Sequence, residues 1–117
     1  MKFTDTLKKN YEFQRLYSKG KSAVTPYLVV YVRKTKKRTN RIGITVSTKL
    51  GKAVTRNRVR RRLREIYRLA EDRFAPGTEM VVVARVRAVK ASYAQLDKAF
   101  MSACEKLGVL REKSEAR

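Results

Sequence analysis

One stretch of the chain decides the fold, residues 41–84: RIGITVSTKLGKAVTRNRVRRRLREIYRLAEDRFAPGTEMVVVA. Its first part, residues 41–47, alternates apolar residues with small or polar ones, which is typical of a half-buried strand. From Arg56 to about Phe74 the apolar residues follow helical spacing, and a Pro-Gly pair at 76–77 marks the end of the helix. EMVVVARV at 79–86 is a continuous apolar run, which indicates an interior strand that is compatible with parallel pairing. The stretch therefore predicts a strand–helix–strand unit.

The predicted helix has one apolar face and a large excess of arginine elsewhere. Its apolar positions fall on one arc at helical spacing: Val59, Leu63, Ile66, Tyr67, Ala70 and Phe74. A second stripe consists of Asn57, Arg61, Arg64 and Arg68, with Arg60 beside it and with Arg58 and Arg62 on the far side. Arg56 falls on the apolar arc, so we expect its side chain to emerge at the very end of the helix or in the preceding loop.

Three further segments have regular patterns. Asn10 is suited to cap a short helix that ends before Gly20. Ser92, with a glutamine three residues later, has the capping-box pattern that begins a last helix. Between these helices, residues 27–34 alternate as a strand does, and residues 21–26 are turn-like or a short edge strand. The order αβββαβα predicts an α+β, two-layer α/β sandwich with about four strands and with three helices on one side of the sheet.

The length of 117 residues fits a single domain that spans residues 1–117. The last segment, LREKSEAR at 110–117, mixes charges of both signs and lacks apolar periodicity, so we expect a frayed tail. The only cysteine, Cys104, falls on the last helix, and we interpret it as a small core residue.

The two faces of the strand at residues 27–34 have different compositions. Leu28, Val30 and Val32 form an apolar face that indicates the core. Tyr27, Val29, Tyr31 and Arg33 form the other face, which resembles a stacking platform, because aromatic rings accept any base at about 1–3 kcal/mol each. In the strand at 41–47, Gly43, Thr45 and Ser47 form a small, polar face. That face favours equally the close approach of an RNA strand and tight packing of a helix.

The chain is strongly basic, and the charge is concentrated in one region. Thirty Lys and Arg residues against ten Asp and Glu residues give a formal charge of +20, which indicates a polyanionic partner. The 52 residues between Glu12 and Glu65 contain 17 Lys and Arg residues and no acid. The sequence has no signal-peptide pattern and no apolar run near the ~20 residues that a membrane helix needs, so we expect a cytoplasmic protein without a membrane partner.

Six arginines lie between Arg56 and Arg64. Cations in the first turn of a helix are disfavoured by the helix dipole by about 0.3–1 kcal/mol each, so local stability does not explain them. Ten acids cannot pair thirty bases, so internal salt bridges do not explain them either. A bound phosphate reverses the sign of the dipole term, and arginine forks suit phosphate oxygens. The run therefore predicts a phosphate-binding helix, for RNA or DNA alike.

Residues 49–68, KLGKAVTRNRVRRRLREIYR, resemble the arginine-rich signature of the bacterial ribonuclease P protein family, with its R-N-R core. RIGITVS before it and EFQRLYSKGKS at 12–22 are similar to the family's preceding strand and its first helix and turn. Two departures are mild, namely Pro26 before the first long strand and the extra base Arg62. The resemblance implies a left-handed β-α-β crossover, where general rules favour a right-handed one.

The resemblance also implies a function. Proteins of this family are the non-catalytic subunit of an endoribonuclease that removes the 5′ leader from precursor tRNA, and the RNA subunit holds the active site with Mg²⁺. By position it assigns contacts with the ribonuclease P RNA or its phosphates to Arg56, Asn57, Arg58, Arg61 and Arg64. We expect the other bases of the same segment to join this surface, namely Lys49, Lys52, Arg60 and Arg68. It assigns the leader-binding cleft, between the first helix and the sheet, to Phe13, Tyr17 and Tyr31. We expect Arg33 at the same cleft, because it shares a strand face with Tyr31. Phe13 and Tyr17 are also suited to plain packing against the sheet.

The residue types argue against catalysis by the protein itself. The chain has no histidine, and no paired carboxylates or metal-ligand cluster accompany the basic segment, so no catalytic residues are expected. The sequence leaves open whether the protein binds a metal. We expect precursor tRNA as a partner, no small-molecule substrate, and a monomer in the absence of RNA. The alternatives are a ribosomal or chaperone-like RNA-binding protein, a free-standing nuclease and a DNA-binding module.

Overall fold

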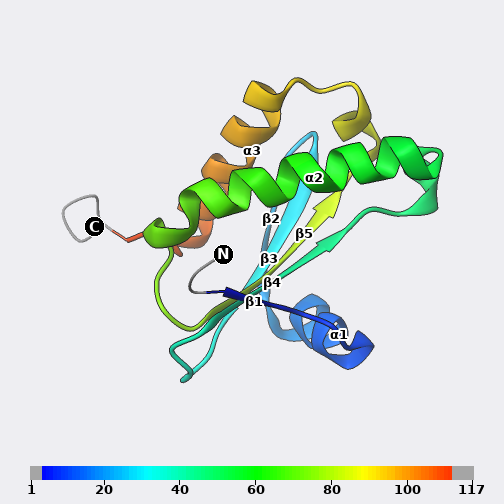
Figure 1. Ribbon diagram of the computed structural model, residues 1–117. Coiled ribbons are helices and arrows are strands. Elements are labelled where there is room, and N and C mark those ends of the chain that lie inside the picture. Colours follow the sequence, from blue (N-terminus) through cyan, green and yellow to red (C-terminus); the bar gives the residue numbers. More distant parts are fainter. Residues whose placement is uncertain (1–3, 112–117) are drawn as a thin grey trace.

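The computed structural model describes residues 4–111, which form a five-stranded sheet and three α-helices (Figure 1). The strands are β1 (Thr4–Thr6), β2 (Lys21–Val24), β3 (Leu28–Lys34), β4 (Asn40–Thr45) and β5 (Thr78–Ala84). The helices are α1 (Asn10–Lys19), α2 (Ala53–Ala70) and α3 (Tyr93–Leu107). Three 3-10 turns connect them: η1 (Thr48–Leu50), η2 (Glu71–Arg73) and η3 (Val86–Val89). None of these helices is long and apolar enough to cross a membrane.

The α+β class, the three helices and the element order from Asn10 onward agree with the prediction. The sheet has five strands rather than about four, because β1 adds a parallel strand at the edge of β4. Leu7 continues this pairing, and its amide donates to the Ile42 carbonyl over 2.9 Å. The sequence did not indicate β1, because three residues, TDT, are too short to show a period.

The strand–helix–strand unit is the centre of the fold. The strand order is β1-β4-β5-β3-β2, and β4 and β5 are parallel neighbours that α2 connects. In Figure 1 α2 passes in front of the sheet. If the picture is turned so that the arrows of β4 and β5 point upward, β5 lies to the left of β4. The β4–α2–β5 crossover is therefore left-handed. β5 has a partner on both sides, as its continuous apolar sequence requires.

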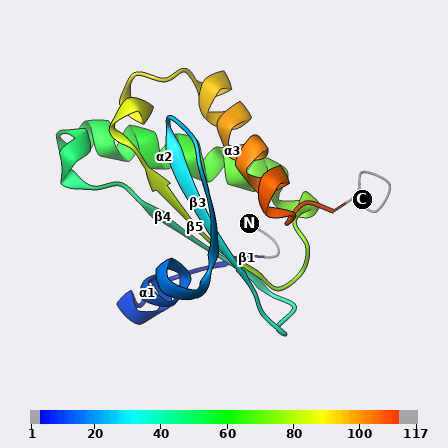
Figure 2. The same ribbon diagram turned by 180° about the vertical axis from the view of Figure 1, so that it is seen from behind.

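The helices lie on both faces of the sheet, and not on one face as predicted. α2 and α3 cover one face and α1 covers part of the other (Figures 1 and 2). The reason lies in β5, where Met80 and Val82 face the main core and Val81 faces a second, smaller core with Leu7 and Leu16. A strand that is apolar on both faces needs a cover on both.

The boundaries of α2 differ from the prediction at both ends. The helix begins at Ala53, three residues before Arg56. Its first hydrogen bond is donated by the Arg56 amide to the carbonyl of Lys52, the cap residue, over 3.0 Å. It ends at Ala70, where η2 turns the chain, so Phe74 is extended and outside the helix. Phe74 is nevertheless buried and stacks on Tyr67, with ring centroids 5.0 Å apart.

The other two helices are capped differently. α1 includes Asn10, so the cap position is Lys9 and not Asn10 as predicted. At α3 the capping box is confirmed, because Ser92 Oγ accepts from the Gln95 amide over 3.1 Å and Gln95 Oε1 accepts from the Ser92 amide over 2.9 Å. Cys104 on α3 is buried in the main core, as predicted.

The chain remains attached to the fold after α3. Leu110 forms an antiparallel bridge with Phe74, and the Arg111 amide donates to the Arg73 carbonyl over 2.7 Å. The remainder of the predicted tail, 112–117, lies outside the described residues.

Candidate nucleic-acid interface

The sheet face that carries α1 consists of three rows of side chains, which the strand register aligns across β4, β5 and β3. The polar row is Arg41, Glu79 and Arg33; the covered row is Gly43, Val81 and Tyr31; the open row is Thr45, Val83 and Val29. The sequence predicted this face on β3 and β4, but not on β5, whose continuous apolar run lacks alternation.

α1 packs directly on the covered row. Leu16 is fully buried in the second core with Val81, and Phe13 lies on Gly43. A Cβ at Gly43 would lie 2.5 Å from Phe13 Cε1, so only glycine admits the ring at this distance. At Gly43 the small-residue face therefore serves helix packing, which was one of the two alternatives. Phe13 is half-buried and belongs to this packing.

Tyr17 and Tyr31 mark the border between the covered row and the open row. Their rings meet edge to face, with centroids 5.0 Å apart and an interplanar angle of 72°. The Tyr17 hydroxyl lies 3.3 Å from Thr45 Oγ1 in the open row. Both tyrosines are half-buried, so each contacts the second core and still presents part of its ring to solvent.

The open row is a mostly apolar strip that α1 covers only in part. Thr45, Val83 and Val29 are half-buried, and Val24 on the edge strand β2 pairs with Val29 and is 61% exposed. We define these four residues with Tyr17 and Tyr31 as the cleft strip. Sequence reasoning missed Val24, because it stands in a short segment before Pro26, and Val83 for lack of alternation in β5.

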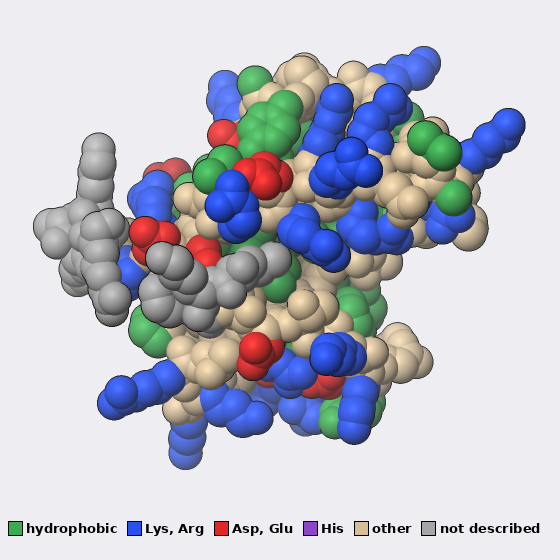
Figure 3. Space-filling model, viewed as in Figure 1, with side chains coloured by type: hydrophobic (Ala, Val, Ile, Leu, Met, Phe, Trp, Pro, Cys, Tyr) green, Lys and Arg blue, Asp and Glu red, His purple; other side chains and the backbone are tan. Residues whose placement is uncertain are grey.

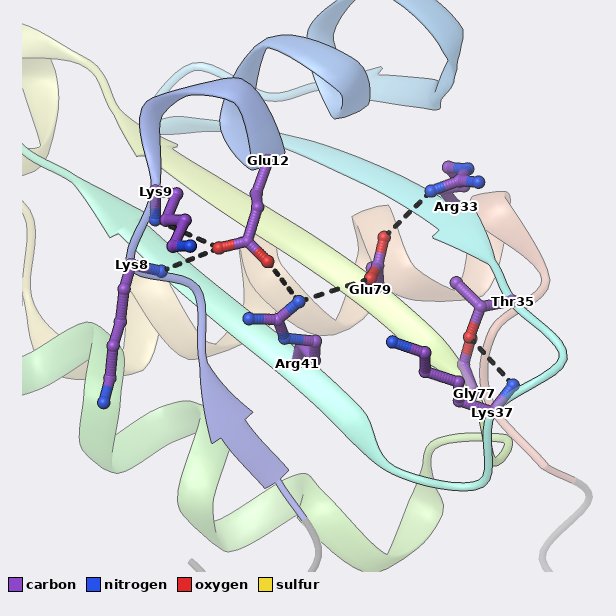
Figure 4. Close-up of polar contacts among 9 residues, drawn as sticks. All are labelled: Lys8, Lys9, Glu12, Arg33, Thr35, Lys37, Arg41, Gly77 and Glu79. Carbon is purple, nitrogen blue, oxygen red and sulfur yellow. Dashed lines mark hydrogen bonds and ion pairs between the residues drawn. The ribbon is translucent and has the colours of Figure 1, made fainter.

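The polar row is a connected ion-pair network (Figure 4). Arg33 Nη1 lies 3.2 Å from Glu79 Oε1, and Arg41 Nη1 lies 4.0 Å from Glu79 Oε2 and closer to Glu12 Oε2. Glu12 Oε1 also accepts from the backbone amides of Lys9 and Lys8, over 3.0 and 3.3 Å. Arg33, expected at the leader cleft, thus already has an acidic partner.

Hydrogen bonds hold Glu12 in its charged form. The amide of Lys9 contributes most to lowering the pKa of the Glu12 carboxyl, and burial opposes this effect. The amide of Lys8 and the guanidinium of Arg41 lower the pKa further. Glu12 and Glu79 are both buried, although acidic side chains seldom are. The sequence offered no signal for this network, since its members come from four separate elements, α1, β3, β4 and β5.

The arginines of α2 divide into paired and unpaired side chains. Arg56 Nε donates to the Gly51 carbonyl over 3.1 Å, and Arg60 Nη1 donates to Asn57 Oδ1 over 2.8 Å. Arg68 forms an ion pair with Glu65 and thereby lowers the pKa of that carboxyl. The extra base Arg62 is half-buried and donates to the Ala91 carbonyl over 3.2 Å.

Arg58, Arg61 and Arg64 are exposed and have no side-chain partner among residues 4–111. The first turn of α2 has no acid, and Lys52 at the cap position makes no side-chain cap bond. Lys49 on η1 and Lys52 are exposed at the same end of the helix. We define Lys49, Lys52, Arg58, Arg61 and Arg64 as the α2 basic surface. Figure 3 shows Lys and Arg side chains gathered along α2, while acidic side chains lie mainly toward the C-terminal end of the helix.

Arg56 occupies a position that the sequence did not predict. Because α2 begins three residues earlier than expected, Arg56 lies within the helix, and its half-buried guanidinium turns back to the Gly51 carbonyl. Gly51 precedes the cap position with φ +126°, a conformation that favours glycine. The sequence signal for this early start was Gly51 itself, which permits the turn between η1 and α2.

Comparisons with known proteins identify the family of the chain. The family model of Ribonuclease P matches residues 1–108. The chain is 46% identical over 96 residues to the Ribonuclease P protein component of Clostridioides difficile strain 630, which is 81% of this chain and 84% of that protein. It is 39% identical over 107 residues to that of Natranaerobius thermophilus, which is 92% of this chain and 93% of that protein.

Solved structures give the same result. The Staphylococcus aureus RNase P protein superposes with a TM-score of 0.83 and 33% identity, over 91% of this chain and 97% of that one. A mutant of the S. aureus protein, described as having defective mRNA degradation activity, has the same TM-score and identity over 90% and 89%. The Thermotoga maritima RNase P protein has a TM-score of 0.75 and 28% identity over 84% and 93%. This chain therefore belongs to the ribonuclease P protein family, whose members are protein components of a tRNA-processing ribonucleoprotein.

Proposed function

We propose that this chain binds the ribonuclease P RNA and the 5′ leader of precursor tRNA, and so assists endonucleolytic removal of the leader. The α2 basic surface carries the first half of the proposal. Arg58, Arg61 and Arg64 are exposed without a partner among the described residues, and they follow α2 beyond its first turn, Ala53–Arg56. Of the α2 basic surface only Lys52, at the cap position, stands where the helix N-terminus itself favours an anion. Like-charged guanidinium groups along one helix repel one another in the isolated protein, and bound phosphate would turn that repulsion into attraction.

The cleft strip supports the second half of the proposal. Tyr17 and Tyr31 are half-buried beside a partly exposed row of the sheet, and base stacking on aromatic rings contributes about 1–3 kcal/mol per base. The open row lies toward the carboxyl ends of β4 and β5, and β4 leads through η1 to the first turn of α2. Leader and RNA subunit would thus bind on adjoining surfaces, which suits a protein that aligns two RNAs.

The chemistry belongs to the RNA subunit in this proposal. The described residues contain no group of three or more His, Cys, Asp or Glu side chains that could hold a metal ion. Mg²⁺, bound mainly by the RNA, would supply the hydrolytic chemistry. The protein would neutralise phosphates and fix the position of the scissile bond through the leader. We further propose that the protein is cytoplasmic and is a monomer in the absence of RNA.

The test is reconstitution with a bacterial ribonuclease P RNA at low Mg²⁺ and measurement of 5′ cleavage of a precursor tRNA. The proposal expects rapid cleavage at the mature 5′ end by the mixture and slow cleavage by RNA alone. It also expects tighter binding of precursor than of mature tRNA by the complex. If the protein adds nothing over RNA alone, a general RNA-binding scaffold becomes the better account.

Protein alone is the control for a second candidate function. The S. aureus mutant is described as defective in mRNA degradation activity, so degradation of mRNA is the second candidate function. The proposal expects no specific cleavage of tRNA precursor or of mRNA by this chain when it is rigorously freed of RNA. Specific cleavage under that condition would establish a protein-borne nuclease.

A further inference from the structure

The ion-pair network of Glu12, Arg41, Glu79 and Arg33 has no role in the proposed function so far. It lies on the same sheet face as the cleft strip, one row beyond the row that α1 covers (Figure 4). It contains two acids and two arginines, so its charges balance, whereas the whole chain carries +20. Exposed cations would favour RNA binding, yet two arginines of this network are neutralised by the buried carboxylates of Glu12 and Glu79.

Glu12 connects the beginning of α1 to the sheet. Its Oε1 atom accepts from the amides of Lys8 and Lys9, which form the approach to α1, and its Oε2 atom pairs with Arg41 on β4. Arg41 in turn reaches Glu79 on β5, and Glu79 reaches Arg33 on β3. One carboxylate therefore joins the helix to three neighbouring strands through a chain of contacts.

The position of α1 determines the shape of the cleft strip. Phe13 lies one residue after Glu12, and Tyr17 lies five residues after it on the same helix. A shift of the helix start would tilt the Tyr17 ring relative to Tyr31, which it now meets at 5.0 Å, and relative to Thr45 Oγ1. A buried ion pair adds little to stability, because the free-energy cost of removing two charges from water is about as large as the gain from their attraction. Such a pair can still hold the elements that it joins in one arrangement.

We propose that Glu12 and Glu79 are positioning residues that hold α1 in the geometry in which the cleft strip recognises the leader. This inference rests on the proposed function, since it assumes that the strip binds leader RNA. The two carboxylates do not touch RNA. They act through Arg41, which bridges them.

Positioning and simple electrostatics predict different results for the same substitution. Removal of an acid from an RNA-binding protein reduces repulsion, so electrostatics alone predicts tighter binding of all RNAs. Positioning predicts that the preference for precursor over mature tRNA decreases, because only the precursor has a leader in the cleft. The ratio of the two dissociation constants separates the effects, since a uniform electrostatic gain cancels in it.

The test uses Glu12→Gln in the complex reconstituted with ribonuclease P RNA. Glutamine has the same shape and keeps an oxygen for the Lys9 amide, but it loses the charge that pairs with Arg41. The matched control is Asp97→Asn, which changes the net charge equally at an exposed α3 residue with no ion pair among residues 4–111. We expect the precursor-to-mature preference to fall about tenfold for Glu12→Gln and to stay constant for Asp97→Asn. The affinity for the RNA subunit should be retained in both variants.

Arg41→Lys is the second variant, and it keeps the net charge while losing the planar group that reaches both carboxylates. It should show the same loss of preference, and it decides the matter if Glu12→Gln is not folded at the assay temperature. Unchanged preference in folded Glu12→Gln or Arg41→Lys would overturn the inference. The proposed function fails separately, if the unsubstituted complex itself shows no preference for precursor.

Discussion

At the scale of single residues, Gly43 determines how closely α1 approaches the sheet. Its missing side chain leaves the space that Phe13 occupies, and an added Cβ would meet two atoms of that ring at 2.5 and 2.8 Å. The sequence left open whether the small residues of β4 admit RNA or a helix, because both need the same lack of bulk. Only the position of Phe13, 30 residues earlier in the chain, decides this for Gly43.

This contact predicts the result of a double-mutant cycle. Gly43→Ala should lower the free energy of unfolding by about 1–3 kcal/mol, because the methyl group overpacks the contact with Phe13. Phe13→Leu removes the ring and should recover part of that loss, so the two changes should be non-additive. Urea denaturation of the four proteins measures the coupling. Additive effects would show that Phe13 does not limit the space at Gly43.

Cys104 is predicted to be chemically inert in the folded protein. The thiol is fully buried, and burial raises its pKa from 9.0 to about 12. Because the folded pKa is the higher one, the neutral thiol favours the folded state below pH 9.0, and this contribution is lost as pH rises toward about 12. A thiol reagent at pH 8 should therefore react only at the rate of unfolding. Reaction at the rate of a free cysteine would contradict the burial.

At the scale of elements, α2 shows what a sequence pattern can and cannot specify. The helical arc correctly predicted that Val59, Leu63, Ile66, Tyr67 and Ala70 are buried. It did not predict the helix start, because periodicity cannot separate Ala53, Val54 and Thr55 from a loop, whereas the turn at Gly51 fixes it. The pattern predicted which side of the helix each arginine occupies. It could not predict that Arg56 and Arg62 donate to the carbonyls of Gly51 and Ala91.

Two arginines of α2 form a matched pair for a prediction. Arg58 is exposed without a partner among the described residues, while Arg62 donates to the Ala91 carbonyl. Arg58→Gln should lower the slope of log affinity for ribonuclease P RNA against log salt by about one unit, with little effect on stability. Arg62→Gln should leave the slope nearly unchanged and destabilise the contact between α2 and the loop before α3. Equal slope changes would mean that Arg62 leaves Ala91 to bind phosphate.

Among the remaining elements, those with a clear pattern in neighbouring residues could be predicted from the sequence. The capping box of α3 and the alternation in β3 are local patterns, and both are confirmed. The polar row could not be predicted, because Glu12, Arg41 and Glu79 meet only once α1, β4 and β5 are assembled. The placement of α1 on the opposite face has the same origin, since it depends on both faces of β5.

At the scale of the whole molecule, the net charge determines how stability responds to salt. The formal charge of +20 is held in a body with a Cα radius of gyration of 13.4 Å. Many like charges therefore lie within a few Debye lengths of one another, the Debye length being about 10 Å at 0.1 M salt. The four ion pairs described above are few beside thirty Lys and Arg residues, so repulsion outweighs the attraction that salt could screen.

We therefore predict that salt stabilises the isolated protein. The free energy of unfolding, measured in urea because urea is uncharged, should rise between low salt and 0.5 M salt. A polyanion that binds the folded state should raise it further at low salt, through charge neutralisation and through linkage to binding. Substitutions that remove one exposed arginine, such as Arg61→Gln, should reduce the dependence on salt. A fall in stability with salt would mean that the four ion pairs outweigh the unpaired charges, and the arginines of α2 would then need a stabilising role within the protein itself.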